Sequence, residues 1–318
     1  MNIVEIKNLN LGFLTELGYK QALYNVSLKL KSGEMHAVVG ESGCGKSITA
    51  MSILNLLPKN AVIKSGEILF ENKNILSIPQ KEMRTIRGAK IALIPQDPMT
   101  SLNPLFTIGD QITETILCHK KIFKQEAKKL ALEALDKVKI PDAQKRFDQY
   151  PHELSGGMKQ RVVIANTLTL DTELIIADEP TTALDVTIQA QIMSLLDEIK
   201  TTYNTSILII THDLSLIGQY ADEISVMYAG NIIENAPTKE FFRNPCHPYS
   251  QALLNSLPTK QKNKPLNNIK GAPPSIFENI KGCKFNPRCS KCLKNKCDEQ
   301  EPVASAITPF HEVKCWLY

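Results

Sequence analysis

The chain of 318 residues contains no apolar run long enough to cross a membrane. Its longest apolar stretches, such as residues 206–210, have the length of a strand. The N-terminal residues lack a charged start followed by an apolar core, so residues 3–9 indicate a first strand and not a signal peptide. We therefore expect a chain that does not cross the membrane and that stays in the cytoplasm.

A large net charge is missing as well. The 37 basic and 33 acidic residues leave a formal charge of only +4, and no basic low-complexity block or repeat stands out. This charge is too small to indicate a nucleic-acid partner. Hydrophobic residues at 43% and charged residues at 22% are typical of a globular protein, and the length allows one large domain with an appendage, or two modest domains.

Residues 36–57, "HAVVGESGCGKSITAMSILNLL", have the strand, loop and helix pattern of a Walker A phosphate loop. Its glycines permit backbone angles that direct N–H groups toward an anion, and the following helix adds its positive N-terminal end. Lys46 would neutralise the β and γ phosphates of ATP, and Ser47 would bind Mg²⁺. The predicted nucleotide contacts in this loop are Gly40, Glu41, Ser42, Gly43, Cys44, Gly45, Lys46, Ser47 and Ile48.

A second motif, "TELIIADEPTTALD" at residues 172–185, places an acidic pair directly after an apolar strand. Asp178 would hold Mg²⁺ through water, and Glu179 would act as the general base that polarises the attacking water. The alternative is that the pair only makes the strand end soluble. The phosphate loop elsewhere in the chain favours the catalytic interpretation.

Between these motifs lies "LSGGMKQR", residues 154–161, and with it the chain resembles the ATP-binding subunit of ABC transporters. The family's other markers occur in order: Gln96 in "LIPQDP", residues 183–185 as the D-loop, and His212 in "IITHDL". The resemblance covers residues 1 to about 240. It implies an α/β P-loop NTPase fold with a mixed sheet core, a helical subdomain at about 97–165 and a small Cys-rich extension at 241–318.

Ser155, Gly156 and Gly157 begin an apolar-periodic helix and would form a further anion site. In the resembled family this site faces the γ-phosphate bound to the opposite subunit, with Asp185 in the adjoining D-loop. The resemblance therefore implies a second ABC ATPase subunit as a partner, and we expect a paralogous heterodimer.

The resemblance also gives Gln96 and His212 roles beside Glu179 in catalysis. Gln96 would touch Mg²⁺ or water, so that the expected magnesium set is Ser47, Gln96 and Asp178, while His212 would contact the γ-phosphate. Adenine would stack on Phe13 or Tyr19, upstream of the phosphate loop, and Phe13 is preferred.

Apolar residues at helical spacing predict a helix over residues 124–140, before Pro141, within the helical subdomain. In the resembled family this subdomain receives the coupling helix of the permease. A shorter helix is predicted at residues 249–257. Lys, Asn, Gly and Pro dominate residues 259–275, which indicates an exposed linker.

Two further stretches, "DEPTTALDVTIQAQIMSLL" and "NPCHPYSQALLNSLP", closely resemble the ATPases of dipeptide, oligopeptide and nickel importers. This implies an ATPase that drives peptide import at the cytoplasmic face of the membrane, with two transmembrane permease subunits and an extracytoplasmic binding protein. Nickel or metal-chelate import stays open. An ABC-type ATPase of DNA repair or translation is disfavoured because the chain has neither a long coiled coil nor a second cassette. A metal-binding regulator on a P-loop scaffold is a third alternative.

Five of the eight cysteines fall in the last 36 residues. A cytoplasmic location disfavours disulfides. Free thiols are one alternative, but clustering in a segment with little apolar surface favours a metal that supplies folding energy. Cys289 and Cys292 would suit a zinc site completed by Cys297 and Cys315. The importer resemblance instead implies a [4Fe–4S] cluster on Cys283, Cys289, Cys297 and Cys315, with Zn²⁺ as the alternative.

Overall fold

The computed structural model describes residues 1–257 and 269–318. The chain forms two compact units, one made of Met1–Leu76 with Ile210–Tyr318 and the other of Ser77–Ile209. We call these the first and the second unit. Residues 259–268 of the predicted linker lie outside the described part of the chain, and residues 270–273 within it are exposed and form no regular element.

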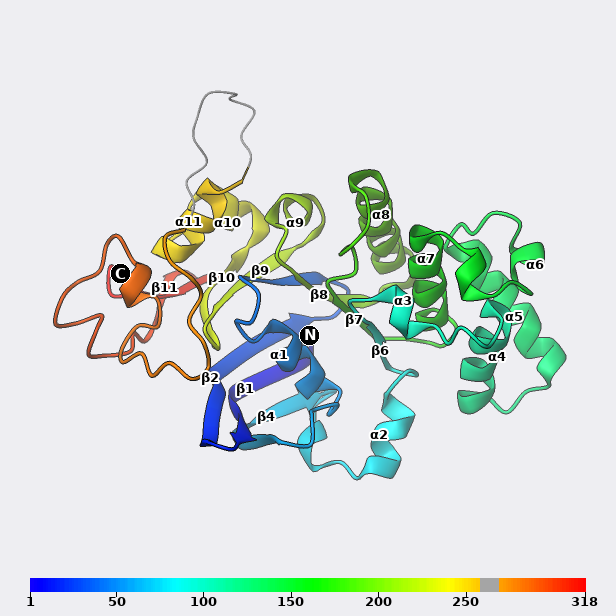
Figure 1. The fold of residues 1–318 in the computed structure, drawn as a ribbon, viewed down its shortest axis with the longest axis horizontal. Helices are drawn as coiled ribbons and strands as arrows, with labels where there is room; N and C mark the ends of the chain where they lie inside the picture. The colour runs from blue at the N-terminus through cyan, green and yellow to red at the C-terminus, as the bar shows by residue number, and fades with distance from the viewer. Residues whose placement is uncertain (258–268) are drawn as a thin grey trace. The chain divides into compact units, whose positions relative to one another are not determined.

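The first unit is built mainly from strands, several of which are labelled in Figure 1. Strand β8 (Ser206–Thr211) runs from the second unit into the first. The other elements are β1 (Asn2–Thr15), β2 (Gly18–Lys31), β3 (Met35–Val39), α1 (Lys46–Ile53), β4 (Ala61–Phe70), β5 (Lys73–Asn74), η1 (Ile75–Ser77), α9 (Leu214–Tyr220), β9 (Glu223–Tyr228), β10 (Asn231–Pro237), α10 (Thr238–Arg243), α11 (Pro248–Asn255), η3 (Asn286–Arg288), β11 (Ala304–Thr308) and β12 (His311–Lys314).

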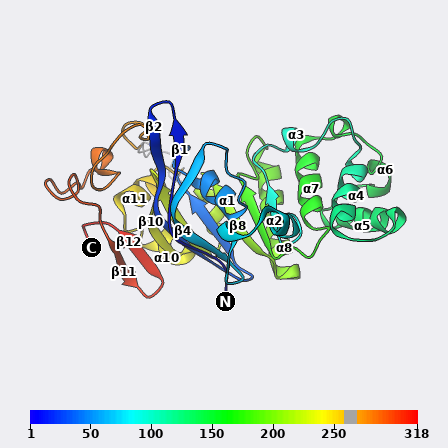
Figure 2. The same ribbon diagram turned by 90° about the horizontal axis from the view of Figure 1, so that it is seen from below.

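Four strands of the first unit form an antiparallel sheet in the order β2-β1-β4-β5. Figure 2 labels the first three of them. The predicted strand at residues 3–9 is the first part of β1. Along the end of β2, buried Val26, Leu28 and Leu30 alternate with exposed lysines and serine. This period of two follows from the pleat, and it buries one face of the sheet while the other meets solvent.

A second group of strands in the first unit has the order β11-β12-β10-β9-β3. β3 and β9 are parallel, whereas the other pairs are antiparallel, so the sheet is mixed. All five residues of β3 are buried, as expected for a strand covered on both faces. The C-terminal hairpin β11–β12 extends this sheet beyond β10 (Figure 2).

The second unit is mainly helical, with the parallel strand pair β6 and β7. α4, α5 and α7 pack side by side (Figure 1). α5 lies where the apolar spacing predicts a helix, and its residues Ala127, Ala134 and Leu135 are buried. The elements are α2 (Gln80–Ile86), β6 (Ile91–Ile94), α3 (Pro98–Ser101), α4 (Ile108–His119), α5 (Lys124–Lys137), α6 (Ala143–Arg146), η2 (Pro151–Glu153), α7 (Gly156–Thr167), β7 (Leu174–Asp178) and α8 (Val186–Tyr203).

Within residues 1–257 and 269–318, no helix combines the length and the apolar character that a bilayer span requires. The longest helix, α8 with 18 residues, has an amphipathic pattern in which Ile192, Leu196 and Ile199 are buried. Most of its exposed positions carry polar or charged groups, although Val186 at its start is exposed as well. The helix therefore packs one face inward and presents the other to water.

The buried His36 in β3 makes the stability of the fold dependent on pH. Burial lowers the pKa of His36 to about 4, and its Nε2 lies 2.8 Å from Ser225 Oγ. An exposed histidine titrates near about 6.5, so between these values the unfolded chain binds a proton that folded His36 does not. Above its pKa in the unfolded chain, His36 is neutral in both states and costs no stability. As the pH falls from there toward the folded pKa, we expect the free energy of unfolding to decrease.

The expected loss from His36 approaches ~1.4 kcal/mol per pH unit across this window. Urea unfolding at stepwise pH measures the slope, and His36→Gln should make the slope shallower whatever it does to absolute stability. An unchanged slope in His36→Gln would show that His36 does not carry the effect.

Candidate nucleotide-binding site

The predicted phosphate loop joins β3 to α1 in the first unit. Gly43 and Gly45 have φ angles of 79° and 110°, which side-chain-bearing residues rarely adopt. Gly45 is the N-cap of α1, so the N–H groups of the first turn lie at the end of the loop. A Cβ on Gly40 would lie 2.2 Å from the Met227 carbonyl oxygen. The loop therefore requires glycine for both its curvature and its packing.

Lys46 lies at the start of α1 and is 5% exposed. Its ammonium donates to the carbonyl oxygens of Gly40 at 2.8 Å and Glu41 at 3.0 Å. The lysine thus spans the loop from within, where a bound phosphate would be a further partner for its charge. Ser47 is exposed, whereas Cys44 is buried and burial raises the pKa of its thiol.

The two aromatic candidates for adenine stacking belong to the β1–β2 hairpin. Phe13 is half-buried and pairs with Lys20 in the hairpin. The Tyr19 ring packs over Gly12 and lies 4.1 Å from the Lys64 ammonium. Since Tyr19 already has this cation partner, Phe13 stays the preferred stacking residue, as a prediction.

In the second unit, β7 ends at Asp178, which is 4% exposed, and Glu179 follows it. Glu179 has a φ of 47°, an uncommon conformation for a residue with a side chain. Gln96 Nε2 donates to Glu179 Oε2 at 3.1 Å, and Thr182 Oγ1 donates to the same oxygen at 3.0 Å. The structure therefore brings two of the three predicted catalytic residues into direct contact.

The signature segment and the D-loop meet at the start of α7. Ser155 is the N-cap of this helix, and its hydroxyl accepts from the Met158 N–H at 3.4 Å. Asp185 caps α8 in the same way, accepting from the Ile188 N–H at 3.0 Å. A Cβ on Gly157 would lie 2.8 Å from Ile188 Cγ2, so this position needs glycine for close packing. Both caps leave a helix N-terminus suited to anions.

His212 follows β8 in the first unit and is exposed. The neighbouring Asp213 starts α9 by accepting from the backbone N–H groups of Ser215 and Leu216. The position of the histidine at a strand end is the one that the sequence predicts. Its proposed contact with the γ-phosphate needs the nucleotide and stays a prediction.

The chemistry of the predicted site residues suits ATP and Mg²⁺. The phosphate loop offers backbone N–H groups and an ammonium, which suit phosphate oxygens. Asp178, Gln96 and Ser47 offer oxygen ligands, which suit Mg²⁺. The phosphate loop of the first unit and the acidic end of β7 in the second unit are each typical of a P-loop nucleotide-binding protein.

Comparisons with known proteins identify the family. The family model described as "ABC transporter" matches residues 23–182, and the model described as "Oligopeptide/dipeptide transporter, C-terminal region" matches residues 233–297. The chain is 48% identical over 317 residues to the dipeptide transport ATP-binding protein DppD of Bacillus subtilis, covering 99% of this chain and 94% of the relative. It is also 48% identical over 318 residues to the oligopeptide transport ATP-binding protein OppD of the same organism, covering 99% and 88%.

A solved dimeric structure of the ATP-binding cassette MJ0796 in a post-hydrolysis state matches with a TM-score of 0.66 and 28% identity, covering 74% of this chain and 98% of that one. The chain belongs to the ABC transporter family. It is an ATPase with that family's P-loop fold of mixed sheet and helices, so the predicted fold and activity are confirmed at this level.

The prediction of a [4Fe–4S] cluster on Cys283, Cys289, Cys297 and Cys315 is wrong. Within the described residues, the one group of potential ligand atoms that all lie within 4.8 Å of each other is Glu234, Cys246 and His311, which contains none of these cysteines. The relatives are named as peptide transport ATP-binding proteins.

A physical reason lies in the environment of the thiols. Burial, together with smaller contributions from neighbouring Cys297, Cys315 and Cys289, raises the pKa of Cys283 to about 12, so the protonated thiol is favoured over the thiolate that a metal requires. Cys283 instead contributes its backbone, whose N–H donates to the Cys297 carbonyl at 2.8 Å.

Glu234, Cys246 and His311 were missed by sequence reasoning because they are far apart in the chain. Glu234 of β10 accepts from the backbone N–H groups of Cys246 and His247, both at 2.7 Å. His311 Nε2 lies 2.9 Å from Glu234 Oε1, and its Nδ1 lies 3.2 Å from Glu240 Oε1. This buried network ties β12, β10 and the start of α11 together.

Replacing Glu234 by Ala should lower the free energy of unfolding by about 3 to 5 kcal/mol, because it leaves two buried N–H groups and His311 without this partner. Chemical unfolding measures the loss. Glu240→Ala is the matched control, since Glu240 is 31% exposed in its side chain and contacts the same histidine. The account fails if Glu240→Ala destabilises the protein as much as Glu234→Ala.

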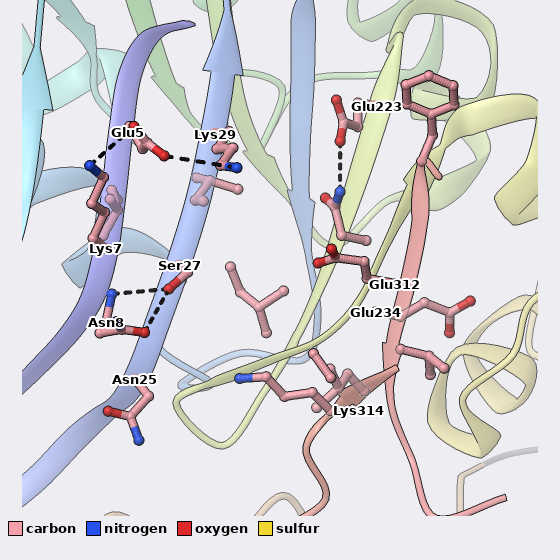
Figure 3. A pocket seen from close by; sticks show the side chains of 18 of the residues that line it. Glu5, Lys7, Asn8, Asn25, Ser27, Lys29, Glu223, Glu234, Glu312 and Lys314 are labelled. Carbon is pink, nitrogen blue, oxygen red and sulfur yellow. Dashed lines mark hydrogen bonds and ion pairs between the residues drawn. The ribbon is translucent and has the colours of Figure 1, made fainter. Parts of the chain in front are cut away.

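A cavity of about 590 Å³ lies in the first unit among residues of β1, β2, β10 and β12. Figure 3 shows Glu5 at its wall between Lys7 and Lys29, with N···O distances of 3.6 and 3.9 Å. Glu312 and Lys314 of β12 also line it. None of the predicted nucleotide-binding residues lines this cavity, and its charges of both signs are close together, so we assign it no role in ATP binding.

Proposed function

We propose that the chain is the ATP-hydrolysing subunit that powers import of dipeptides or oligopeptides. The observation that carries this proposal is the 48% identity to both DppD and OppD of Bacillus subtilis across 99% of the chain. The match of residues 233–297 to the peptide transporter C-terminal region supports it. Residues 1–240 would be the nucleotide-binding domain, with a helical subdomain at about 97–165, and residues 241–318 the importer-type extension.

The partners follow from the same relatives. As a transport ATP-binding protein, the chain would act with two transmembrane permease subunits and with an extracytoplasmic binding protein that would select the peptide. The chain would bind peripherally at the cytoplasmic face of the membrane. The dimer reported for MJ0796 supports pairing with a second ATPase subunit, and we propose a paralogous one.

Within the first unit, Lys46 and the backbone N–H groups of the phosphate loop would hold the β and γ phosphates. Mg²⁺ held by Ser47, Asp178 and Gln96 would neutralise phosphate charge. Glu179 would accept a proton from the attacking water, and the Gln96 amide at 3.1 Å would orient its carboxylate for this.

The remaining predicted residues complete the proposal. Ser155, Gly156 and Gly157 would bind the γ-phosphate on the opposite subunit, with Asp185 beside them holding the start of α8. His212 would contact the γ-phosphate in its own subunit, and Phe13 would stack on adenine. The helix N-terminus capped by Ser155 supports the first of these roles.

Transport in a strain lacking this chain tests the proposal and its nickel alternative together. Uptake of a labelled dipeptide, a labelled longer peptide and nickel is measured before and after the chain is restored. We expect peptide uptake to be lost and then restored, with nickel uptake unchanged. Loss of nickel uptake with normal peptide uptake would contradict the proposal and support nickel or metal-chelate import.

A further inference from the structure

The Cys-rich part of the C-terminal region contacts the phosphate loop through Arg288. Its guanidinium makes a two-pronged ion pair with Glu41, with Nη1 at 2.6 Å from Oε2 and Nη2 at 3.0 Å from Oε1. The Arg288 side chain is only 7% exposed. The two parallel N–H···O bonds of such a bidentate pair add geometric specificity as well as energy, whereas many exposed ion pairs contribute little.

Arg288 is held in place on its other sides as well. Its Nε donates to the Lys270 carbonyl at 2.9 Å, Nη2 donates to the Gly271 carbonyl at 3.0 Å, and Nη1 lies 3.3 Å from the Tyr228 hydroxyl. These bonds orient the plane of the guanidinium independently of Glu41, so little side-chain freedom is lost in forming the ion pair.

Tyr249 in α11 makes a second contact with the same residue of the loop. Its hydroxyl accepts the Glu41 N–H at 2.9 Å. The ring is fully buried and packs against Tyr228 and Phe285, with ring centroids 4.7 and 5.3 Å away. Burial raises the pKa of Tyr249, so the phenol stays neutral and keeps its place in the apolar packing.

Glu41 also accepts the Lys46 ammonium on its carbonyl oxygen at 3.0 Å. Each polar group of Glu41 therefore has a partner: the carboxylate binds Arg288, the N–H binds Tyr249, and the carbonyl binds Lys46. The first two partners come from the C-terminal region, and the third is the lysine predicted to bind phosphate. Movement of Glu41 would move an acceptor of that lysine.

We propose that Arg288 and Tyr249 are positioning residues that hold Glu41, and through it Lys46, in the conformation that binds ATP. The C-terminal region thereby sets the nucleotide affinity of the phosphate loop. This inference rests on the proposed role of Lys46 in the ATPase and adds a function for the region beyond the peptide-importer match.

The test measures binding of a fluorescent ATP analogue with Mg²⁺, and the KM and kcat for ATP, on the complete transporter carrying each variant. Arg288→Ala should weaken binding about tenfold, and Tyr249→Phe, which removes only the hydroxyl, about threefold. KM should rise by similar factors while kcat at saturating ATP stays near wild type. Arg288→Lys keeps the positive charge but lacks the paired N–H donors of the guanidinium, so it should recover only part of the ATP affinity.

Lys291→Ala is the matched control, because Lys291 is a basic residue of the same segment that donates to Gln251 of α11 at 2.9 Å. It should bind ATP as wild type does. Combining Arg288→Ala with Glu41→Gln distinguishes an effect through Glu41 from general damage. The double variant should be little weaker than Arg288→Ala alone.

Wild-type affinity in both Arg288→Ala and Tyr249→Phe, with normal thermal unfolding, would overturn the inference, as would fully additive losses in the double variant. The wild-type chain is measured for ATP binding first and independently of peptide uptake. A failure of peptide transport would therefore contradict the proposed function but not the role of Arg288 and Tyr249. Unchanged ATP affinity in the variants would contradict that role but not the proposed function.

Discussion

Replacing Glu179 by Gln should stall ATP hydrolysis while ATP binding persists. The amide keeps an oxygen that can accept from Gln96 and Thr182, which donate to Glu179 Oε2 at 3.1 and 3.0 Å, so the local geometry should survive. What is lost is the ability to take a proton from water. General-base catalysis contributes roughly 10²- to 10⁴-fold, and we expect a rate loss in that range.

Phosphate release from the complete transporter measures the effect, with binding of a fluorescent ATP analogue measured in parallel. Glu173→Gln is the control, because Glu173 lies directly before the other end of β7 and pairs with Lys90 at 3.0 Å. It should hydrolyse ATP as wild type does. Hydrolysis at the wild-type rate by Glu179→Gln would exclude Glu179 as the general base.

Replacing Lys46 by Ala should remove most ATP binding. The buried ammonium bonds the carbonyls of Gly40 and Glu41 at 2.8 and 3.0 Å, so its loss removes both the charge that would meet phosphate and a link that holds the loop. Charge-assisted hydrogen bonds contribute about 1.5 to 3 kcal/mol, and with the loop contacts the affinity should fall about a hundredfold.

Titration of a fluorescent ATP analogue measures the loss for Lys46→Ala. Lys59→Ala removes an exposed lysine from the same unit and should leave the affinity unchanged. ATP binding by Lys46→Ala as tight as that of wild type would contradict the role of Lys46. The backbone N–H groups of the loop would then be sufficient to bind the phosphates.

The sequence predicts those parts of the site that depend on neighbouring residues. The phosphate loop, the acidic end of β7 and the caps at Ser155 and Asp185 each arise from a few consecutive residues, and the structure places them at a strand end or a helix start. The helix α5 follows equally from its apolar spacing.

Contacts between distant residues could not be predicted in this way. Arg288 and Glu41 are 247 positions apart, and Glu234 and His311 are 77 positions apart, so no local residue spacing predicts either contact. The spacing of the cysteines gave a wrong prediction of a [4Fe–4S] cluster for a related reason. Spacing shows which thiols are available, but the burial that raises the pKa of Cys283 to about 12 appears only in three dimensions.

The central claim is that ATP hydrolysis by this chain drives peptide import. Its most direct test is uptake of a labelled peptide into vesicles that contain the complete transporter with its binding protein, with ATP and Mg²⁺ supplied on the side of this chain. We predict ATP-dependent uptake with the wild-type chain, and with Glu179→Gln an uptake rate lowered by the roughly 10²- to 10⁴-fold that loss of a general base costs. Equal uptake by both chains, or uptake without ATP, would contradict the account.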